Sequence, residues 1–171
     1  HGDYPKALHH YFRALELDSA LGNKPGIATK LGNIGIVYME QGHYPKALHH
    51  YFRSLELDSV LGNKSGITRH IGNIGNVYYE KGDYPKAFYY YFRALELDSA
   101  LGNKRDMAID LGNIGVLYTK TCEFGKAENF LVRALALSTE IGALREQKYH
   151  HEGFVALYDT LAVISKSQKE K

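Results

Sequence analysis

Apolar residues recur along most of the chain with the spacing of a helix. Across residues 68–80, Ile71, Ile74 and Val77 are three positions apart and Tyr78 follows directly, so all four lie on one helical face. A glycine and then a proline come next, and these residues are typical of a helix end and of the first turn of a new helix. The pattern predicts pairs of helices of about 16–19 residues each, and no strand.

The helical pair is repeated along the chain. The second half of the pair begins at Tyr4, Tyr44 and Tyr84, which are 40 residues apart, and a weaker copy begins at Phe124. A segment of the first half, residues 31–35, recurs with the same spacing of 40 residues. Each pair buries one face internally and needs a neighbour to cover the other. The sequence therefore predicts an all-α fold, an α-solenoid of stacked antiparallel helix hairpins with about four repeats.

The repeats are expected to form one domain, a single array over residues 1–165. In the fourth repeat Cys122 replaces the turn glycine and Gly125 replaces the proline, so this turn is less regular than the others. The Lys/Glu-rich residues 166–171 are expected to be a frayed tail. The expected parts of the array are a lone second helix at 3–22, full repeats at 25–62, 65–102 and 105–142, and a partial repeat at 145–165.

The repeated residues resemble the tetratricopeptide repeat (TPR) family. The 40-residue period is longer than the family's usual period of about 34. It is similar to that of a subclass found in kinesin light chains, in spindle adaptors that bind Gα subunits and in bacterial signalling arrays. In the second repeat the family pattern is carried by Ala28, Leu31, Ile34, Gly35, Tyr38, Gly42, Tyr44, Ala47, Tyr51 and Ser54.

The resemblance implies a concave groove that binds a protein or peptide. In the family, the first helix of each hairpin lines this groove. The positions that the resemblance assigns to the groove are Asn33, Ile36, Met39, Arg69, Asn73, Asn76, Tyr79, Ile109, Asn113, Val116 and Thr119.

An asparagine recurs at the same place in three repeats, each time directly after a glycine. A carboxamide can bond both the C=O and the N–H of an extended backbone, and the glycine leaves room for a ligand to approach. Alternatively, the asparagines cap or bridge neighbouring hairpins and the glycines serve close helix packing. The sequence leaves both interpretations open.

Other functions find little support in the composition. The net charge of +2, with both signs intermixed, favours neither nucleic acid nor a membrane surface as a partner. The lone Cys122 rules out an internal disulfide, and adjacent histidines such as His49 and His50 diverge by about 100° on a helix and cannot share a metal. No catalytic or phosphate-binding motif is present. We therefore expect no enzyme activity, no cofactor and no metal, and a cytoplasmic location.

The expected function is a scaffold that binds an extended peptide or a partner helix in the groove. There are two alternatives to this function. One is a self-assembly module that stacks through uncapped repeat ends, and the other is a regulatory or sensor segment of a larger signalling protein. The identity of the ligand is not encoded in a recognisable motif.

Overall fold

The computed structural model describes residues 3–169 and contains eight helices and no strand over that range. The chain divides into two compact units, His1–Asp83 and Tyr84–Lys171, which we call the N-terminal and C-terminal units and describe separately. The helices are α1 (Tyr4–Ala20), α2 (Lys24–Glu40), α3 (Tyr44–Leu61), α4 (Lys64–Glu80), α5 (Tyr84–Leu101), α6 (Lys104–Lys120), α7 (Phe124–Glu140) and α8 (Leu144–Lys169).

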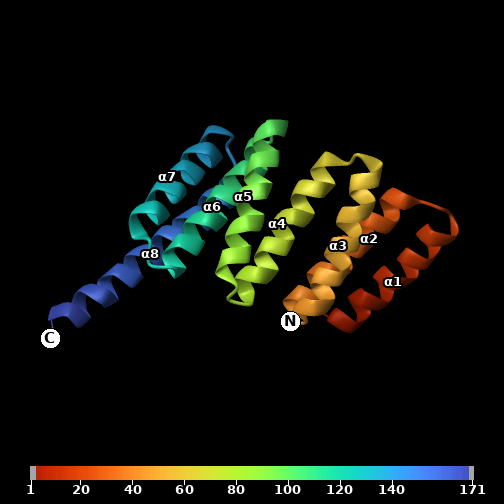
Figure 1. Ribbon diagram of the computed structural model, residues 1–171, viewed down its shortest axis with the longest axis horizontal. Helices are drawn as coiled ribbons and strands as arrows, with labels where there is room; N and C mark the ends of the chain where they lie inside the picture. The colour runs from red at the N-terminus through yellow and green to blue at the C-terminus, as the bar shows by residue number, and fades with distance from the viewer. Residues whose placement is uncertain (1–2, 170–171) are drawn as a thin grey trace. The chain divides into compact units, whose positions relative to one another are not determined.

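Within each unit, every helix packs against the next one along the chain (Figure 1). In the N-terminal unit α2 lies between α1 and α3, and α4 packs on α3. In the C-terminal unit α6 packs on α5 and α7, while α8 contacts both α6 and α7. The predicted all-α fold of helix hairpins is thereby confirmed.

Helices α1 to α7 have 17 or 18 residues, within the predicted range. Helix α8 is longer, with 26 residues, and continues through Lys169 where a frayed tail was expected from residue 166. Residues 170 and 171 of that expected tail lie outside the described residues. The single array over residues 1–165 stays a prediction. Over the described part of the chain, every helix is too short or too polar to cross a bilayer.

Glycine sets the distance between the two helices of a hairpin. A Cβ atom on Gly35 of α2 would lie 2.7 Å from Cε1 of Tyr51 on α3, closer than carbon atoms can approach. In the C-terminal unit, a Cβ on Gly115 would lie 2.8 Å from Cγ of Leu131. Tyr51 and Leu131 are both fully buried, so each of these glycines admits a large core side chain.

The irregular turn at Cys122 keeps the geometry of the glycine turns. Cys122 has a φ of 60°, close to the 73° of Gly42 at the equivalent turn. Its N–H donates to the carbonyl of Thr119 (3.2 Å), as the N–H of Gly42 donates to that of Met39 (2.9 Å). The backbone hydrogen bonds of the turn therefore hold a residue other than glycine in the left-handed conformation, at a cost of roughly 1–2 kcal/mol.

Polar side chains meet wherever the second helix of one repeat packs on the first helix of the next. We call the two residues at each place a junction pair. Three of the four pairs are chemically complementary, with closest side-chain distances of 3.7, 3.1 and 3.2 Å in the first, second and fourth. In chain order the junction pairs are Asp18–Lys30, Asp58–His70, Asp98–Asp110 and Ser138–His150.

The histidines of two junction pairs are buried and neutral at pH 7. Burial lowers the pKa of His70, although the neighbouring Asp58 acts in the opposite direction. Its Nε2 also lies 2.8 Å from Oγ of Ser54, which donates to the backbone carbonyl of Ala28. Burial likewise lowers the pKa of His150. The two pairs are therefore held by hydrogen bonds to a neutral imidazole ring and not by attraction between two opposite charges.

The third junction pair brings two carboxyl groups together. Asp98 and Asp110 are 2% and 5% exposed, and their side chains are hydrogen-bonded to each other. Burial, together with the charges of Asp98 and Asp106, raises the pKa of Asp110 to about 8. Two buried carboxylates in contact cannot both ionise, so the pair holds a proton at neutral pH.

The glycine at position 35 gives the first prediction. Gly35→Ala is expected to lower the free energy of unfolding by about 1 kcal/mol, because overpacking outweighs the gain in helix propensity. Gly125→Ala in α7 is the control, since nothing lies within 4 Å of a Cβ there, and it should stabilise by about 0.5 kcal/mol. Denaturant titration measures both variants. Equal stabilisation by the two substitutions would contradict the packing argument.

The carboxyl junction pair predicts a stability that falls with rising pH. The pKa of Asp110 is 3.8 when unfolded and about 8 when folded, so the folded state holds the extra proton between these values. The contribution of Asp110 to the free energy of unfolding is therefore highest below pH 4. It declines towards pH 8 by up to about 1.4 kcal/mol per pH unit.

Asp110→Asn removes this dependence, because the amide can still bond to Asp98 and does not ionise. The gain in melting temperature of Asp110→Asn over wild type should grow between pH 5 and pH 8. Asp159→Asn, at an exposed position on α8, should show no such growth. A constant difference for Asp110→Asn across this range would show that the pair is not protonated.

Candidate binding site

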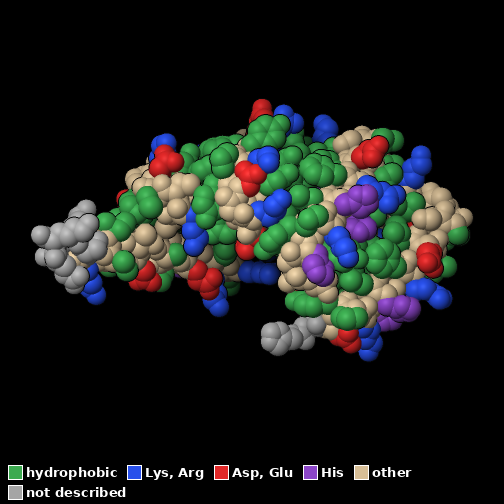
Figure 2. Space-filling view, turned by 60° about the horizontal axis from the view of Figure 1, so that its bottom comes forward, with side chains coloured by type: hydrophobic (Ala, Val, Ile, Leu, Met, Phe, Trp, Pro, Cys, Tyr) green, Lys and Arg blue, Asp and Glu red, His purple; other side chains and the backbone are tan. Residues whose placement is uncertain are grey.

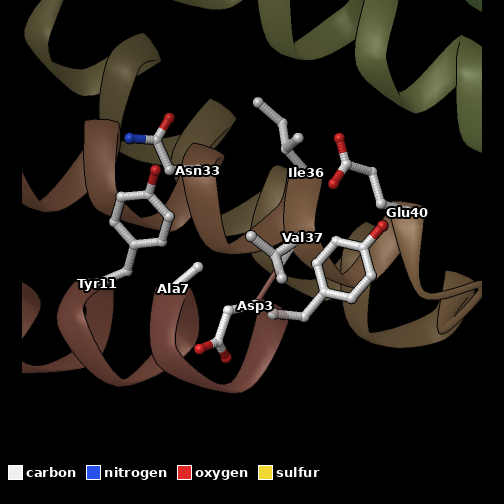
Figure 3. Close-up of a pocket in the computed structure, with 8 residues that line it drawn as sticks. Asp3, Ala7, Tyr11, Asn33, Ile36, Val37 and Glu40 are labelled. Atoms are coloured by element: carbon white, nitrogen blue, oxygen red, sulfur yellow. The ribbon is translucent and has the colours of Figure 1, made fainter. Parts of the chain in front are cut away.

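A pocket of about 260 Å³ lies between α1 and α2 in the N-terminal unit (Figure 3). Residues of α1 and the residue before it form one wall, and residues of α2 form the other. The lining residues are Asp3, Tyr4, Ala7 and Tyr11 on the first wall and Asn33, Ile36, Val37 and Glu40 on the second.

Helical spacing brings these side chains to the pocket. Positions 4, 7 and 11 lie on one face of α1, and positions 33, 36, 37 and 40 lie on one face of α2. Asp3 caps α1, accepting at Oδ1 a hydrogen bond of 3.1 Å from the N–H of Lys6, so its carboxyl group is held at the start of the helix. In Figure 3 the hydroxyl of Tyr11 points towards Asn33.

The same face of α3 is covered in this structure, whereas that of α1 is not. Residues 4–13 and 44–53 have identical sequences. On α3, Ala47 and Tyr51 are completely buried, and α2 covers them through Gly35. On α1 the equivalent Ala7 and Tyr11 are only half-buried. The pocket is therefore formed by a helix face of the kind that binds another helix elsewhere in this unit.

The pocket carries negative charge. Asp3 and Glu40 are both exposed carboxylates, and none of the described lining residues is basic. The influence of Glu40 extends to the core, because burial and then the Glu40 charge raise the pKa of Tyr51. An anionic ligand group would be repelled here.

The recurring asparagines have different surroundings. Asn33 lines the pocket, whereas Asn113 bridges two helices, accepting at Oδ1 a hydrogen bond of 2.9 Å from the hydroxyl of Tyr149 on α8. Asn73 and Asn76 are half-buried on α4. One asparagine therefore lines a pocket and another joins neighbouring repeats, while ligand binding by the asparagines stays a prediction.

Packing explains Gly32 and Gly112, two of the three glycines that precede the asparagines. A Cβ on Gly32 would lie 2.6 Å from Cε1 of His70, and one on Gly112 would lie 2.6 Å from Cδ2 of His150. Each glycine leaves room for the histidine of a junction pair from the next repeat. No ligand is needed to account for Gly32 and Gly112.

Other residues assigned to the groove also differ in accessibility. Ile36 is exposed and lines the pocket, and Arg69 is exposed on α4. Val116 packs against the buried cluster that contains Leu131 and Leu157. Half-buried positions are taken by Met39, Tyr79 and Ile109.

The expectation for Thr119 needs correction. Its side chain is 6% exposed, and its hydroxyl donates to the carbonyl of Gly115 at 3.2 Å. A threonine can satisfy its hydroxyl on the preceding helical turn, which allows its burial. Thr119 therefore does not offer its hydroxyl to a ligand.

The adjacent histidines belong to an aromatic surface. Figure 2 shows histidine side chains grouped on the N-terminal unit, with Lys and Arg side chains among them. Tyr38 stacks on His50 with ring centroids 5.5 Å apart, and Lys46 Nζ lies 5.2 Å from the Tyr38 centroid. His49 meets His50 edge-on. Across the described residues, His, Cys, Asp and Glu side chains form no group suited to holding a metal ion.

Sequence reasoning missed the contribution of α1 to the pocket. It assigned the groove only to first helices, and α1 is a second helix, so Asp3, Tyr4 and Tyr11 were not considered. Glu40 was missed because its exposed position at the end of α2 looked like ordinary surface. The signal that could have drawn attention to α1 is its identity with α3, whose Tyr51 is buried where Tyr11 is half-buried.

Comparisons with known proteins agree with this geometry. The model of the family described as tetratricopeptide repeat matches residues 2–59 and 66–140. A search of curated proteins gave no match.

Several solved structures share the fold at low sequence identity. BtubC (BKLC) from P. vanneervenii has a TM-score of 0.72 and 19% identity, with 98% of this chain and 73% of that one covered. A Rap protein, solved in complex with competence and sporulation factor, has a TM-score of 0.80 and 18% identity, covering 97% and 49%. The putative kinesin light chain repeats of Podospora anserina have a TM-score of 0.66 and 11% identity, covering 98% and 90%.

The chain thus spans about half the length of the Rap protein, which has the highest TM-score of these three. At these identities the likenesses concern the fold, and the family model identifies the repeat itself. With two matched stretches that together cover most of its length, the chain belongs to the tetratricopeptide repeat family.

Proposed function

We propose that this chain is a protein-interaction scaffold that binds an extended peptide or a partner helix in a groove lined by the first helices of its repeats. Repeats of this family commonly serve as interaction scaffolds. The observation that carries the proposal is that Asn33 and Ile36, two residues assigned to the groove from the sequence, line one pocket. The absence of enzyme activity and the cytoplasmic location both stay predictions.

The exposed face of α2 that lines the pocket suits a peptide as ligand. Ile36 and Val37 offer apolar contact, while the amide of Asn33 can bond a peptide backbone. The complex of the Rap protein with competence and sporulation factor is a precedent for ligand binding by a similar fold.

Self-assembly by stacking of repeat ends finds less support. In a hairpin of this chain, the second helix packs its aromatic or leucine side chain against a glycine of the first, as Tyr51 does on Gly35. The position of α8 in register with Gly35 and Gly115 is Val155, which is 60% exposed. A valine there would collide with Tyr11 of a second copy, so α1 and α8 are poorly matched.

The role of Asn33 is tested with peptides selected from a displayed library of random hexapeptides. Asn33→Ala is expected to weaken binding of the selected peptides about tenfold, because the backbone of the ligand loses hydrogen bonds. The melting temperature should stay the same, since Asn33 borders an open pocket. Isothermal titration calorimetry measures the affinity, with Asn129→Ala on the exposed face of α7 as control. Failure to select any peptide would refute the proposed function.

The bridge between Asn113 and Tyr149 is expected to be structural. Tyr149→Phe removes only the hydroxyl and should destabilise by about 0.5–1 kcal/mol, with Asn113→Ala giving a similar loss. A double-mutant cycle should show that the two losses are not additive. Affinity for the selected peptides should not change, because the bridge is remote from the pocket residues in sequence and belongs to the other unit. Additive losses would show that the bridge is absent in solution.

A further inference from the structure

We infer that a second surface of the N-terminal unit, formed by residues other than those assigned to the groove, binds an acidic segment of a partner protein. We call it the cationic surface. It is carried by two exposed cations that neighbouring rings hold in place. The residues of the cationic surface are Tyr38 on α2 and Lys46, His49, His50 and Arg53 on α3.

The helices packed against α3 leave this surface open. α3 contacts both α2 and α4, so it has a neighbour on each side within the unit. Lys46, His49 and Arg53 are nevertheless exposed. The equivalent Lys86 and Arg93 of α5 are exposed too, although α6 and α7 follow in the same unit. The exposure therefore belongs to this helix face and recurs from repeat to repeat.

Helical spacing places the cations in one row. Positions 46, 49, 50 and 53 follow i, i+3, i+4 and i+7 on α3. Lys46 and Arg53 thus stand two turns apart on one face, which is about 10.5 Å along the helix axis. Residues 41–55 contain no Asp or Glu, and the acids that flank this stretch are Glu40 and Glu56.

The rings beside the cations hold them in position. Lys46 Nζ lies 5.2 Å from the ring centroid of Tyr38, whose face attracts an ammonium group. Tyr38 stacks on His50 with ring centroids 5.5 Å apart. Burial, and then the charges of His49 and Arg53, lower the pKa of His50 to about 4, so this ring is neutral at pH 7. A cation that is already held in position loses less conformational entropy when a ligand binds.

The C-terminal unit contains the same arrangement with one difference. Lys126 Nζ lies 5.2 Å from the ring centroid of Tyr118, and the guanidinium of Arg133 lies 5.1 Å from that of Phe130. Lys126 is also bonded to the carboxylate of Glu123, three residues before it. The charge of this lysine is therefore partly neutralised within the chain.

His43 takes the place of that glutamate in the N-terminal unit. Its ring centroid lies 6.1 Å from that of Tyr38, so it borders the cationic surface. An imidazole carries no negative charge and does not compete for Lys46. In Figure 2, Lys and Arg side chains lie among the histidines of this unit. The cationic surface thus offers positive charge that an incoming carboxylate can neutralise.

The spacing of the cations suits an extended acidic peptide. Residues three positions apart in an extended chain are about 10 Å apart, which matches the two helical turns between Lys46 and Arg53. A guanidinium can bond both oxygens of a carboxylate. Phe12 of α1 is 37% exposed and meets His50 edge-on, with ring centroids 6.2 Å apart, so it offers an apolar contact beside the charges.

A nucleic acid fits this surface less well than an acidic peptide. Binding of single strands relies on bases that stack on aromatic rings. Here the rings of Tyr38 and His50 are engaged with each other, and Lys46 lies over Tyr38. The charged groups are therefore presented to a ligand in preference to the ring faces.

The test uses the full chain and a fluorescein-labelled peptide of four Glu-Leu-Ser units, which has a carboxylate at every third residue. Fluorescence anisotropy should show that this Glu peptide binds about tenfold more tightly than a matching Gln-Leu-Ser peptide. Raising NaCl from about 50 mM to about 500 mM should remove most of this difference.

The first protein variant is Lys46→Gln with Arg53→Gln, which removes both charges and keeps the apolar stems. It should weaken binding of the Glu peptide about tenfold. The matched control is Lys126→Gln with Arg133→Gln, which should change the affinity less than about twofold because Glu123 already neutralises the lysine. Melting followed by circular dichroism checks that each variant is folded.

A second variant leaves both cations in place. His43→Glu introduces beside Lys46 the acid that the C-terminal unit has at the equivalent position, and it should weaken binding of the Glu peptide about threefold. The side chain of His43 makes no capping hydrogen bond, so α3 should remain intact.

The outcomes are distinct from those that test the groove. Equal affinity for the Glu and Gln peptides would overturn the inference, as would equal losses from the paired variants of the two units. A labelled oligothymidine that binds more tightly than the Glu peptide, and loses affinity with Lys46→Gln and Arg53→Gln, would overturn it in favour of nucleic acid. Library peptides whose binding depends on Asn33 should bind all these variants as they bind wild type.

Discussion

The close approach of paired helices is the constraint on which the rest of this structure depends. Gly35 and Gly115 allow a tyrosine or a leucine to fill the space beside a helix backbone, and any side chain at these positions would collide with it. Gly32 and Gly112 likewise leave room for His70 and His150, the polar side chains that arrive from the next repeat. At the pocket, Tyr11 repeats the position that Tyr51 holds on α3, and it is half-buried there.

Local patterns were sufficient to predict the helices and their pairing. Glycine, asparagine and proline at regular places delimit the helices, and the apolar spacing gives the buried face of each. The turn at Cys122 was less certain from sequence, yet backbone hydrogen bonds keep it in the left-handed conformation. Contacts such as Asp98 with Asp110 could not be foreseen, because they depend on how two helices are placed along each other and not on either helix alone.

The candidate site was predictable in part. Asn33 and Ile36 were expected in the groove because first helices line it in related repeats, and both line the pocket. The sequence could not show that Asn113 is engaged by Tyr149, since this bond joins side chains from two helices. Nor could it show that Tyr11 borders a cavity, because the identical sequence around Tyr51 is fully buried. The same local sequence is therefore half-buried on α1 and buried on α3.

The junction pairs bear on how nearly identical repeats avoid assembling in the wrong order. Apolar faces that repeat every 40 residues fit one another almost equally well, so they discriminate poorly between correct and shifted partners. The polar residues do discriminate. A misplaced partner that set Ser138 against Lys30 would leave the ammonium group without the carboxylate of Asp18, which it faces in its own pair. The pairs that contain Lys30 or Ser138 therefore favour one order of repeats, whereas Asp58 and Asp98 present the same group to any partner.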